Sequence, residues 1–245
     1  MSSSGGLPGE HLPGTDWPAD GPWTRLVMLR ALDGGVAGAD HRSRSISDDT
    51  DRSLLARTRE LAHGIVVGAG TMRTEPYGRP QVSAGAAAER ERLGLGEAPR
   101  LVVVSATLDL PWGEEALTDP RPDVRPVVVT GSDADPGRLE RARAQADVVQ
   151  VGSLTAPAML AALHQRGLTR LSCEGGPTVI REFLEADVVD EMILTIAPFA
   201  ATWAPPGVHG DTPAATRFEL RELGSVDSYL YARYLRSPDP ARTPA

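Results

Sequence analysis

Two glycine-rich segments are the clearest candidates for chemistry in this sequence. The first, Gly68-Ala69-Gly70-Thr71, follows the apolar run 65–67. The second, Glu174-Gly175-Gly176-Pro177-Thr178, follows another apolar run and opens into a helical pattern. Glycine lets a ligand approach the backbone closely, and the free N–H groups at the start of a helix bind anions such as pyrophosphate. Neither segment fits the dinucleotide or P-loop fingerprint, and either alone is also typical of a simple tight turn.

Two such segments in one α/β domain favour a binding site, because ligands gather at the carboxyl ends of parallel strands. Glu174 supports this interpretation, since a carboxylate at the end of a buried strand needs a partner. From these residues alone we infer a site for a phosphorylated small molecule, with a dinucleotide as one candidate.

The residue types that are missing exclude several classes of chemistry. All 25 basic residues are arginine, which excludes a Schiff-base, pyridoxal-phosphate or Walker A lysine. Cys173 is the only cysteine, which excludes a disulfide and a cysteine-based zinc cluster. The five histidines are scattered, without the spacing of a metal site, and we expect no bound metal.

Charge and hydropathy limit which classes of partner we expect the protein to bind and where in the cell we expect it. The formal net charge is −8 and the sequence has no basic block, so we expect no nucleic-acid partner. No window approaches the roughly 18 consecutive apolar residues of a membrane span, and the first residues lack the pattern of a signal peptide. We therefore expect a cytoplasmic protein without a membrane partner.

Apolar runs and helical patterns alternate through the middle of the chain, and strands end it. Short β-branched runs such as 100–105 and 125–131 are typical of strands buried in a parallel sheet. This order predicts an α/β fold with a mostly parallel central sheet, flanked by helices, and an antiparallel C-terminal edge. The predicted strands are 25–32, 64–70 (running into the first glycine turn), 100–105, 125–131, 147–152, 170–176, 190–199, 218–226 and 228–236, and the predicted helices are 47–62, 136–146, 155–167 and 177–186.

Composition divides the chain into one domain and two tails. Residues 1–22 and 237–245 are rich in Gly, Pro and Ser and lack periodicity, so we expect flexible tails around a single domain over 23–236. The polar segment 79–98 predicts a long, mobile connection. At the first helix we expect Ser47 to be the N-cap, with acidic residues following at the positive end of the helix dipole.

Four motifs, in this order, resemble a known family of reductases. They are WTRLVMLRALDGGVAG (23–38), RSRSIS (42–47), LLARTRELAHGIVVGAGTMRTEPYG (54–78) and LSCEGGPTVIREFLEADVVDEMILTIAPF (171–199). They resemble the reductase domain of bacterial riboflavin biosynthesis. More closely, they resemble the stand-alone actinobacterial pyrimidine reductases, which share the dihydrofolate reductase-like fold. The resemblance covers about residues 23–236.

The resemblance implies an NADPH-dependent reductase of 5-amino-6-ribosylaminouracil 5′-phosphate, in which nicotinamide delivers hydride to the open-chain sugar carbon. It implies a small, phosphorylated heterocyclic substrate, no metal or flavin, and a homodimer. Bifunctional relatives also carry a zinc deaminase domain, but this chain has neither its His-x-Glu nor its Pro-Cys-x-x-Cys motif. We expect NADPH to be preferred over NADH.

The resemblance also assigns residues to the site. Asp33 and Glu174 are implied as catalytic residues. Arg59 is implied near the substrate phosphate, and Ser105 near the 2′-phosphate of the cofactor. The implied substrate-binding residues are Ser43, Arg59, Arg79 and Glu174, and the implied cofactor-binding residues are Ser45, Gly68, Gly70, Thr71, Glu75, Ser105, Gly175, Gly176, Pro177, Thr178 and Val179.

Plainer interpretations of these residues stay open. Arg59 is also consistent with a solvated helix residue, and Asp33 with the cap of a turn at Gly34. Ser43 and Ser45 are also consistent with ordinary loop residues.

Two departures from the family pattern leave the substrate open. The first strand carries Val27, Arg30 and Ala31 where relatives often have an amide and two hydroxyl side chains, and 200–210 is bulkier than the relatives' glycine-rich loop. Both changes concern the substrate more than the cofactor. The alternatives are a reductase of another heterocycle on the same scaffold, such as a pterin or a specialised metabolite, and a nucleotide-binding protein without turnover.

Overall fold

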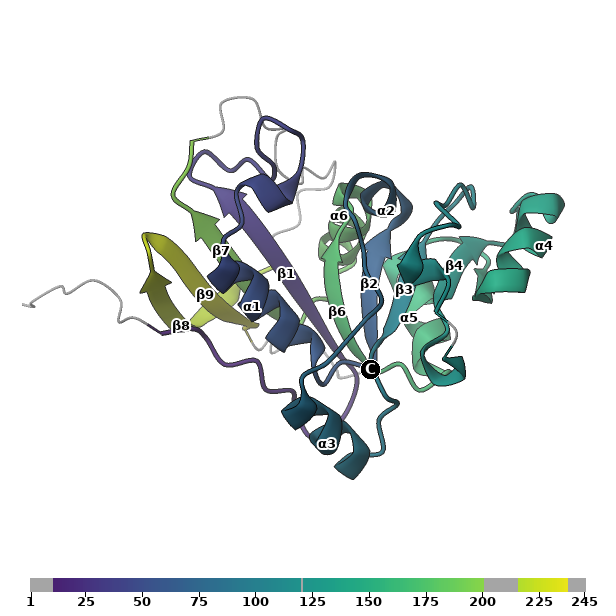
Figure 1. Ribbon diagram of the computed structural model, residues 1–245, viewed down its shortest axis with the longest axis horizontal. Helices are drawn as coiled ribbons and strands as arrows, with labels where there is room; N and C mark the ends of the chain where they lie inside the picture. The colour runs from purple at the N-terminus through teal and green to yellow at the C-terminus, as the bar shows by residue number, and fades with distance from the viewer. Residues whose placement is uncertain (1–10, 120, 201–215, 238–245) are drawn as a thin grey trace, which may run out of the picture.

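The described residues form a nine-stranded sheet with helices on both faces (Figure 1). The structure is a computed structural model that describes residues 11–119, 121–200 and 216–237. The strands are β1 (Trp23–Ala31), β2 (Gly64–Gly68), β3 (Arg100–Val104), β4 (Val127–Gly131), β5 (Asp147–Val151), β6 (Arg170–Gly175), β7 (Glu191–Ala197), β8 (Phe218–Val226) and β9 (Tyr229–Arg236). The α-helices are α1 (Asp49–Arg59), α2 (Ala69–Thr74), α3 (Ala84–Arg92), α4 (Pro136–Gln145), α5 (Ala156–His164) and α6 (Pro177–Glu185), with short 3₁₀ turns η1 (Ser43–Ser45), η2 (Glu115–Leu117) and η3 (Pro122–Val124).

The predicted α/β fold with an antiparallel C-terminal edge is confirmed. The strand order is β5-β4-β3-β2-β6-β1-β7-β9-β8. The pairs from β5 to β7 are parallel, and β7–β9 and β9–β8 are antiparallel. Residues 1–10 and 238–245 of the expected tails, and residues 201–210 of the bulky segment, lie outside the described residues.

The strand order creates a switch point in the middle of the sheet. Strands β2 and β6 are neighbours, but the chain leaves β2 toward β3 on one side and leaves β6 toward β7 on the other. Ligands of open α/β sheets bind outside the carboxyl ends of strands at such a point. Both predicted glycine segments follow these two strands.

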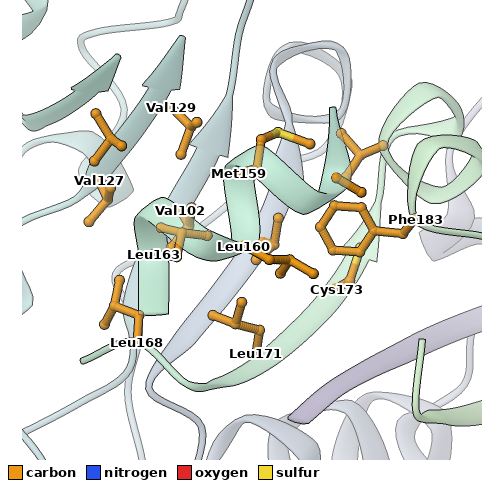
Figure 2. Packing of buried hydrophobic residues seen from close by; sticks show 14 of the residues in the cluster. Val102, Val127, Val129, Met159, Leu160, Leu163, Leu168, Leu171, Cys173 and Phe183 are labelled. Atoms are coloured by element: carbon orange, nitrogen blue, oxygen red, sulfur yellow. The ribbon is translucent and has the colours of Figure 1, made fainter. Parts of the chain in front are cut away.

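One face of the sheet is covered by α5 and α6. Figure 2 shows Met159, Leu160 and Leu163 of α5 and Phe183 of α6 packed on Leu171 and Cys173 of β6 and on valines of β3 and β4. Most of these side chains are at most 1 % exposed. The valine runs predicted as buried strands fit this two-sided burial, because parallel strands have helices on both faces.

The opposite face of β1, β7 and β9 is covered by α1. Leu54 of α1 packs with Ile193 of β7 and Tyr231 of β9. The N-cap of this helix is Asp48, whose carboxylate accepts a hydrogen bond from the Asp51 backbone N–H and another from the Tyr231 hydroxyl. The prediction of Ser47 as the cap is wrong by one residue, because Asp48 is the residue in reach of a free N–H of the first turn.

Two further expectations differ from the structure. The first glycine segment is not a turn but the start of α2, in which Gly68 is the N-cap. The segment 79–98 contains α3, which the buried Arg90 anchors by donating hydrogen bonds to the carbonyls of Glu60, Ala62 and Gly96. A buried arginine with carbonyl partners is hard to predict, because the polar sequence around Arg90 is typical of a solvent-exposed helix or a loop.

Part of the segment expected as an N-terminal tail lies against the sheet. Trp17 is buried, and the Arg25 guanidinium lies 4.1 Å from the centre of its ring. Arg25 and Glu191 are both fully buried and lie 3.0 Å apart, and Arg233 donates to the same carboxylate at 2.7 Å. Arg25 also donates to the carbonyls of Thr15 and Asp16. Residues 11–22 thereby cover a buried charge cluster at the amino end of β1.

In the part of the chain that the structure describes, no helix combines the length and the apolar character that a membrane crossing requires.

Candidate active site

The two glycine segments meet at the carboxyl ends of β2 and β6. A Cβ atom on Gly176 would lie 3.1 Å from the Cα atom of Gly68, and Gly176 has a φ of +84°. A Cβ atom on Gly68 would in turn lie 3.4 Å from Gly176 Cα and from Val179 Cγ2. These two glycines are therefore explained by close approach of two backbone segments. Figure 1 shows α2 and α6 starting together at this edge.

Gly70 has a different setting from Gly68 and Gly176. It is exposed in α2, and a Cβ atom there would meet nothing within 4 Å. Glycine is unfavourable inside a helix compared with alanine, so packing does not explain it. Thr71 follows it, with its hydroxyl oxygen 3.5 Å from a Cβ placed on Gly176. The backbone at Gly70 is therefore open to close approach.

Glu174 owes its position to an irregularity in β6. The pairing of β2 with β6 shifts register between Val66, which faces Cys173, and Val67, which faces Gly175. Glu174 is the extra residue, and bulges of this kind redirect a side chain next to functional sites. Its side chain is only 3 % exposed. The bulge directs a buried carboxylate to the edge where the glycine segments meet.

Arg59, the last residue of α1, pairs with this carboxylate. Its Nε atom donates to Glu174 Oε1 at 2.6 Å, and its Nη2 atom donates to Oε2. Ser172 adds a longer contact of 3.4 Å from its hydroxyl to Oε1. The structure thus brings together two residues that are 115 positions apart in the sequence. Burial lowers the pKa of the guanidinium, but the Glu174 carboxylate outweighs burial and the pKa of Arg59 is raised.

Tyr77 completes this group and was not predicted from the sequence. Its ring centre lies 5.8 Å from the Arg59 guanidinium carbon, within the range of a cation–π contact. Burial, together with the charge of Glu174, raises the pKa of its hydroxyl. The sequence feature that could have identified Tyr77 is an aromatic residue two positions after Glu75, in a segment of otherwise polar and small residues.

The loop before α1 is tied to the end of α2. The Glu75 carboxylate accepts hydrogen bonds from the Ser43 backbone N–H at 2.7 Å and from the Ser43 hydroxyl at 3.0 Å. Ser45 donates its hydroxyl proton to the Arg42 carbonyl. The structure therefore pairs Ser43, predicted on the substrate side, with Glu75, predicted on the cofactor side.

Two implied site residues have local structural partners instead, and a third is exposed. Ser105 is buried, and its hydroxyl oxygen accepts the Leu108 backbone N–H at 2.9 Å. Asp33 is exposed and accepts the Gly35 N–H, which is the turn-capping role considered as its plainer interpretation. Arg79 is exposed, beyond the Glu75–Tyr77 segment.

The remaining implied residues, Gly175, Pro177, Thr178 and Val179, lie at the end of β6 and in the first turn of α6. The N-cap of α6 is Gly176, which has no side chain to occupy the first backbone N–H groups.

The chemistry that these groups can do is binding and orientation. Burial raises the pKa of the Cys173 thiol to about 12, which makes it inert as a nucleophile at neutral pH. Within 11–119, 121–200 and 216–237, no three His, Cys, Asp or Glu side chains cluster in a way that could hold a metal ion. The edge offers an open glycine backbone, an uncapped helix start and a buried ion pair. These features suit a reaction whose reactive group is supplied by a bound cofactor.

Known proteins resemble this chain in sequence. The family model described as the RibD C-terminal domain matches residues 22–227. A 2,5-diamino-6-ribosylamino-4(3H)-pyrimidinone 5′-phosphate reductase from Methanothermobacter thermautotrophicus is 30 % identical over 87 % of this chain and 97 % of the relative. A riboflavin biosynthesis protein RibD from Bacillus amyloliquefaciens is 25 % identical, over 78 % of this chain and 50 % of the relative.

Solved structures show the same architecture. A pyrimidine reductase-like protein from Corynebacterium diphtheriae superposes with a TM-score of 0.81 at 31 % identity, covering 89 % of this chain and 93 % of that one. A deaminase/uracil reductase from Thermotoga maritima has a TM-score of 0.67 at 20 % identity, covering 89 % of this chain and 57 % of that one, which supports the fold alone. With a family model matched over most of its length, the chain belongs to the family of RibD C-terminal domains.

Proposed function

We propose that this protein is a cytoplasmic, NADPH-dependent reductase of a ribosylamino pyrimidine 5′-phosphate in riboflavin biosynthesis. The observation that carries the proposal is the edge where Gly70, the start of α6 and the Arg59–Glu174 pair come together in a chain of this family. The relatives named as reductases of 2,5-diamino-6-ribosylamino-4(3H)-pyrimidinone 5′-phosphate support a phosphorylated pyrimidine as the substrate. The proposal extends to either the diaminopyrimidinone or the aminouracil form.

The residues at the edge fit a dinucleotide. Gly176 leaves the first N–H groups of α6 without a side-chain cap, and such groups favour the pyrophosphate of a dinucleotide. Gly70 leaves backbone open to close approach, and Thr71 supplies a hydroxyl beside it. When bound, the nicotinamide supplies the hydride that reduces the sugar carbon. The protein has to hold the nicotinamide and the sugar carbon close together in the right orientation and exclude water.

The Arg59–Glu174 pair is proposed to hold the polar edge of the substrate. Two guanidinium nitrogens already donate to Glu174, so the pair carries no net charge. Its raised pKa keeps Arg59 protonated, so the residue acts as a fixed donor and not as an acid. Tyr77 fixes the other side of the guanidinium. A rigid, neutral pair suits a heterocycle with alternating donors and acceptors better than it suits a phosphate.

The direct test is turnover with defined substrates. We expect NADPH oxidation, followed at 340 nm, with 2,5-diamino-6-ribosylamino-4(3H)-pyrimidinone 5′-phosphate or with its aminouracil counterpart. We expect slower oxidation with NADH and with the dephosphorylated compounds. Binding of NADPH without oxidation in the presence of either pyrimidine would favour the nucleotide-binding alternative, and turnover with a pterin alone would favour another heterocycle.

Gly70 offers a sharper test of the cofactor position, with Gly85 as a matched control. Both glycines are the second residue of a helix, both are exposed, and a Cβ atom on either meets nothing within 4 Å. Alanine at either position should raise the free energy of unfolding slightly, by up to about 1 kcal/mol. Only Gly70→Ala should weaken NADPH binding, by about tenfold, in a fluorescence titration. Equal NADPH affinity in the two variants would place the cofactor elsewhere.

We also propose that the protein is a homodimer that uses the outer face of β7, β9 and β8. Residues Leu194 and Ile196 of β7 lie on the side of the sheet opposite to α1, since alternate residues such as Ile193 pack under that helix. On β8, Leu220 is 49 % exposed and pairs with Tyr234 on the same side. An apolar face on three adjacent strands can pack on the same face of a second copy about a two-fold axis, which favours a second copy as its occupant.

A further inference from the structure

Arg30 is a cation at the carboxyl edge of the sheet, and the described part of the chain gives it no ion-pair partner. Its Nε atom is buried and makes no hydrogen bond. Within the described residues, Arg30 takes part in none of the ion pairs, whereas Arg59, which also lies at this edge, is neutralised by Glu174. A half-buried guanidinium that lacks a counter-charge carries an unfavourable desolvation cost. A ligand anion would remove that cost.

The register of β1 locates this cation. Leu26 pairs with Cys173 of β6, and both belong to the cluster under α6. Met28 is the next residue on that side and packs against the same cluster. Arg30 follows on the same side, about 13 Å beyond Leu26 at the usual rise per strand residue. It therefore stands past the apolar cluster, near the level at which β6 ends and α6 begins.

The charge of the whole molecule makes a local cation necessary. The formal net charge of −8 does not attract a phosphorylated ligand. The Arg59 side chain, expected at the substrate phosphate, is occupied by Glu174. The Arg30 guanidinium makes no ion pair within the described residues and its Nε atom makes no hydrogen bond, so it still has donors to offer, and an arginine fork matches two phosphate oxygens.

We propose that Arg30 binds a phosphate group of the ligand at this edge and so helps to determine which ligand the protein accepts. The proposal rests on the proposed function, which supplies two sources of phosphate: the pyrophosphate of the dinucleotide and the 5′-phosphate of the pyrimidine. The chemistry is the same for both sources, a charge-assisted, two-point contact. Arg30 lies on the same side of the sheet as α6, whose start is the proposed site of the pyrophosphate.

The test compares Arg30→Gln, which keeps the length of the side chain and removes its charge, with Arg141→Gln as control. Arg141 is exposed on α4, away from this edge, so its variant has the same change in net charge. We expect Arg30→Gln to weaken binding of at least one phosphate-bearing ligand about tenfold or more, and Arg141→Gln to leave binding unchanged. The ligands are NADPH, inorganic pyrophosphate, and the pyrimidine with and without its 5′-phosphate, each titrated by calorimetry.

The pattern of losses identifies the phosphate. A loss for NADPH and pyrophosphate assigns Arg30 to the dinucleotide, and a loss only for the phosphorylated pyrimidine assigns it to the substrate. Either loss should shrink at high salt, because screening weakens a charge contact. Arg30→Lys keeps the charge and should lose less ligand affinity than Arg30→Gln. If the glutamine variant fails to fold, the affinity of the lysine variant is compared with that of the parent instead.

The proposal is overturned if Arg30→Gln folds and binds every ligand like the parent, if the lysine and glutamine variants lose equally, or if the only change is in the oligomeric mass. Failure of the parent to bind NADPH at all would instead count against the proposed function.

Discussion

Removing one partner of the Arg59–Glu174 pair should lower the free energy of unfolding, and the size of the loss should depend on which partner is removed. Arg59→Ala leaves a carboxylate that is 3 % exposed without its counter-ion, whereas Glu174→Gln leaves a guanidinium that is 26 % exposed and can reach water. We expect a loss in unfolding free energy of about 2–3 kcal/mol for Arg59→Ala and about 1 kcal/mol for Glu174→Gln. Urea unfolding at pH 7 measures both.

Arg57→Ala is the matched control for the arginine change, since Arg57 lies in the same helical turn and is half-buried. It should cost less than about 0.5 kcal/mol. Equal losses for Arg57→Ala and Arg59→Ala would mean that the pair adds nothing beyond the packing of an arginine stem.

At the scale of single residues, the sequence predicted which side chains stand near the site better than what they contact. Arg59 and Glu174 were both selected, but their pairing follows from the insertion of β6 beside β2, which no local pattern encodes. Ser105 was selected as a cofactor contact, yet its hydroxyl caps a turn at Leu108, which has a φ of +57°. The direction of a side chain after a strand depends on the loop that follows, and the loop was not predictable.

At the scale of elements, a side chain at Gly176 should destabilise the junction of β2 and β6. Gly176 and Gly34 have nearly equal φ values, +84° and +85°, but only Gly176 has backbone atoms 3.1–3.2 Å from an added Cβ. Gly34→Ala should cost about 1 kcal/mol, from backbone strain alone. Gly176→Ala should cost about 2–3 kcal/mol, because strain and overlap with Gly68 add.

Thermal unfolding of the two variants separates the contributions. If Gly176→Ala is no less stable than Gly34→Ala, then the close approach of the two glycine segments does not hold the site together. A reduced NADPH affinity of Gly176→Ala is no evidence for ligand contact by itself, since the variant also displaces α6.

The strands were predicted more completely than the helices, for a physical reason. Buried strands such as β3 and β4 consist of continuous β-branched residues, which few other structures require. In contrast, α2 has six residues, one of them glycine, and α3 buries only Ala86 and Arg90. Neither helix has the apolar stripe on which a helix prediction depends.

At the scale of the whole molecule, His63 should make stability depend on pH. Its ring Nδ1 accepts the Arg170 backbone N–H at 2.9 Å, where β2 meets β6. Burial, together with the charges of Arg170 and Arg90, lowers the pKa of His63 to about 4. The unfolded chain, with a pKa near 6.5, therefore binds a proton that the folded chain does not, so stability is lost as pH falls from 6.5 toward 4.

The loss attributable to His63 should reach about 2 kcal/mol at pH 4, allowing for solvent around the half-buried ring. His63→Asn keeps an acceptor for the Arg170 N–H and removes the titration. Urea unfolding of both proteins between pH 7 and 4 isolates the effect, since the carboxylates contribute equally to both. Parallel stability curves would show that His63 titrates normally in the folded protein.

The proposed dimer is tested on the same scale with two exposed leucines. Leu220 lies on the apolar face of β8, and Leu93 ends α3; they are 49 % and 37 % exposed. We expect a dimeric mass by light scattering at micromolar concentration for the parent and for Leu93→Glu. Leu220→Glu should be monomeric, because it places a charge in the interface. A monomeric parent would contradict the proposal.

The strand order also has a consequence for how the chain is made. Strand β1 is among the first elements synthesised, but both of its partners, β6 and β7, begin only at residues 170 and 191. At a synthesis rate of 5–20 residues per second, about 7–28 s separate β1 from β6. During that time an apolar strand emerges from the ribosome with two unpaired edges, which is the condition that recruits chaperones. Nascent chains arrested before residue 170 should therefore remain protease-sensitive throughout 23–31, and protection of this segment should appear only after β6 and β7 have emerged.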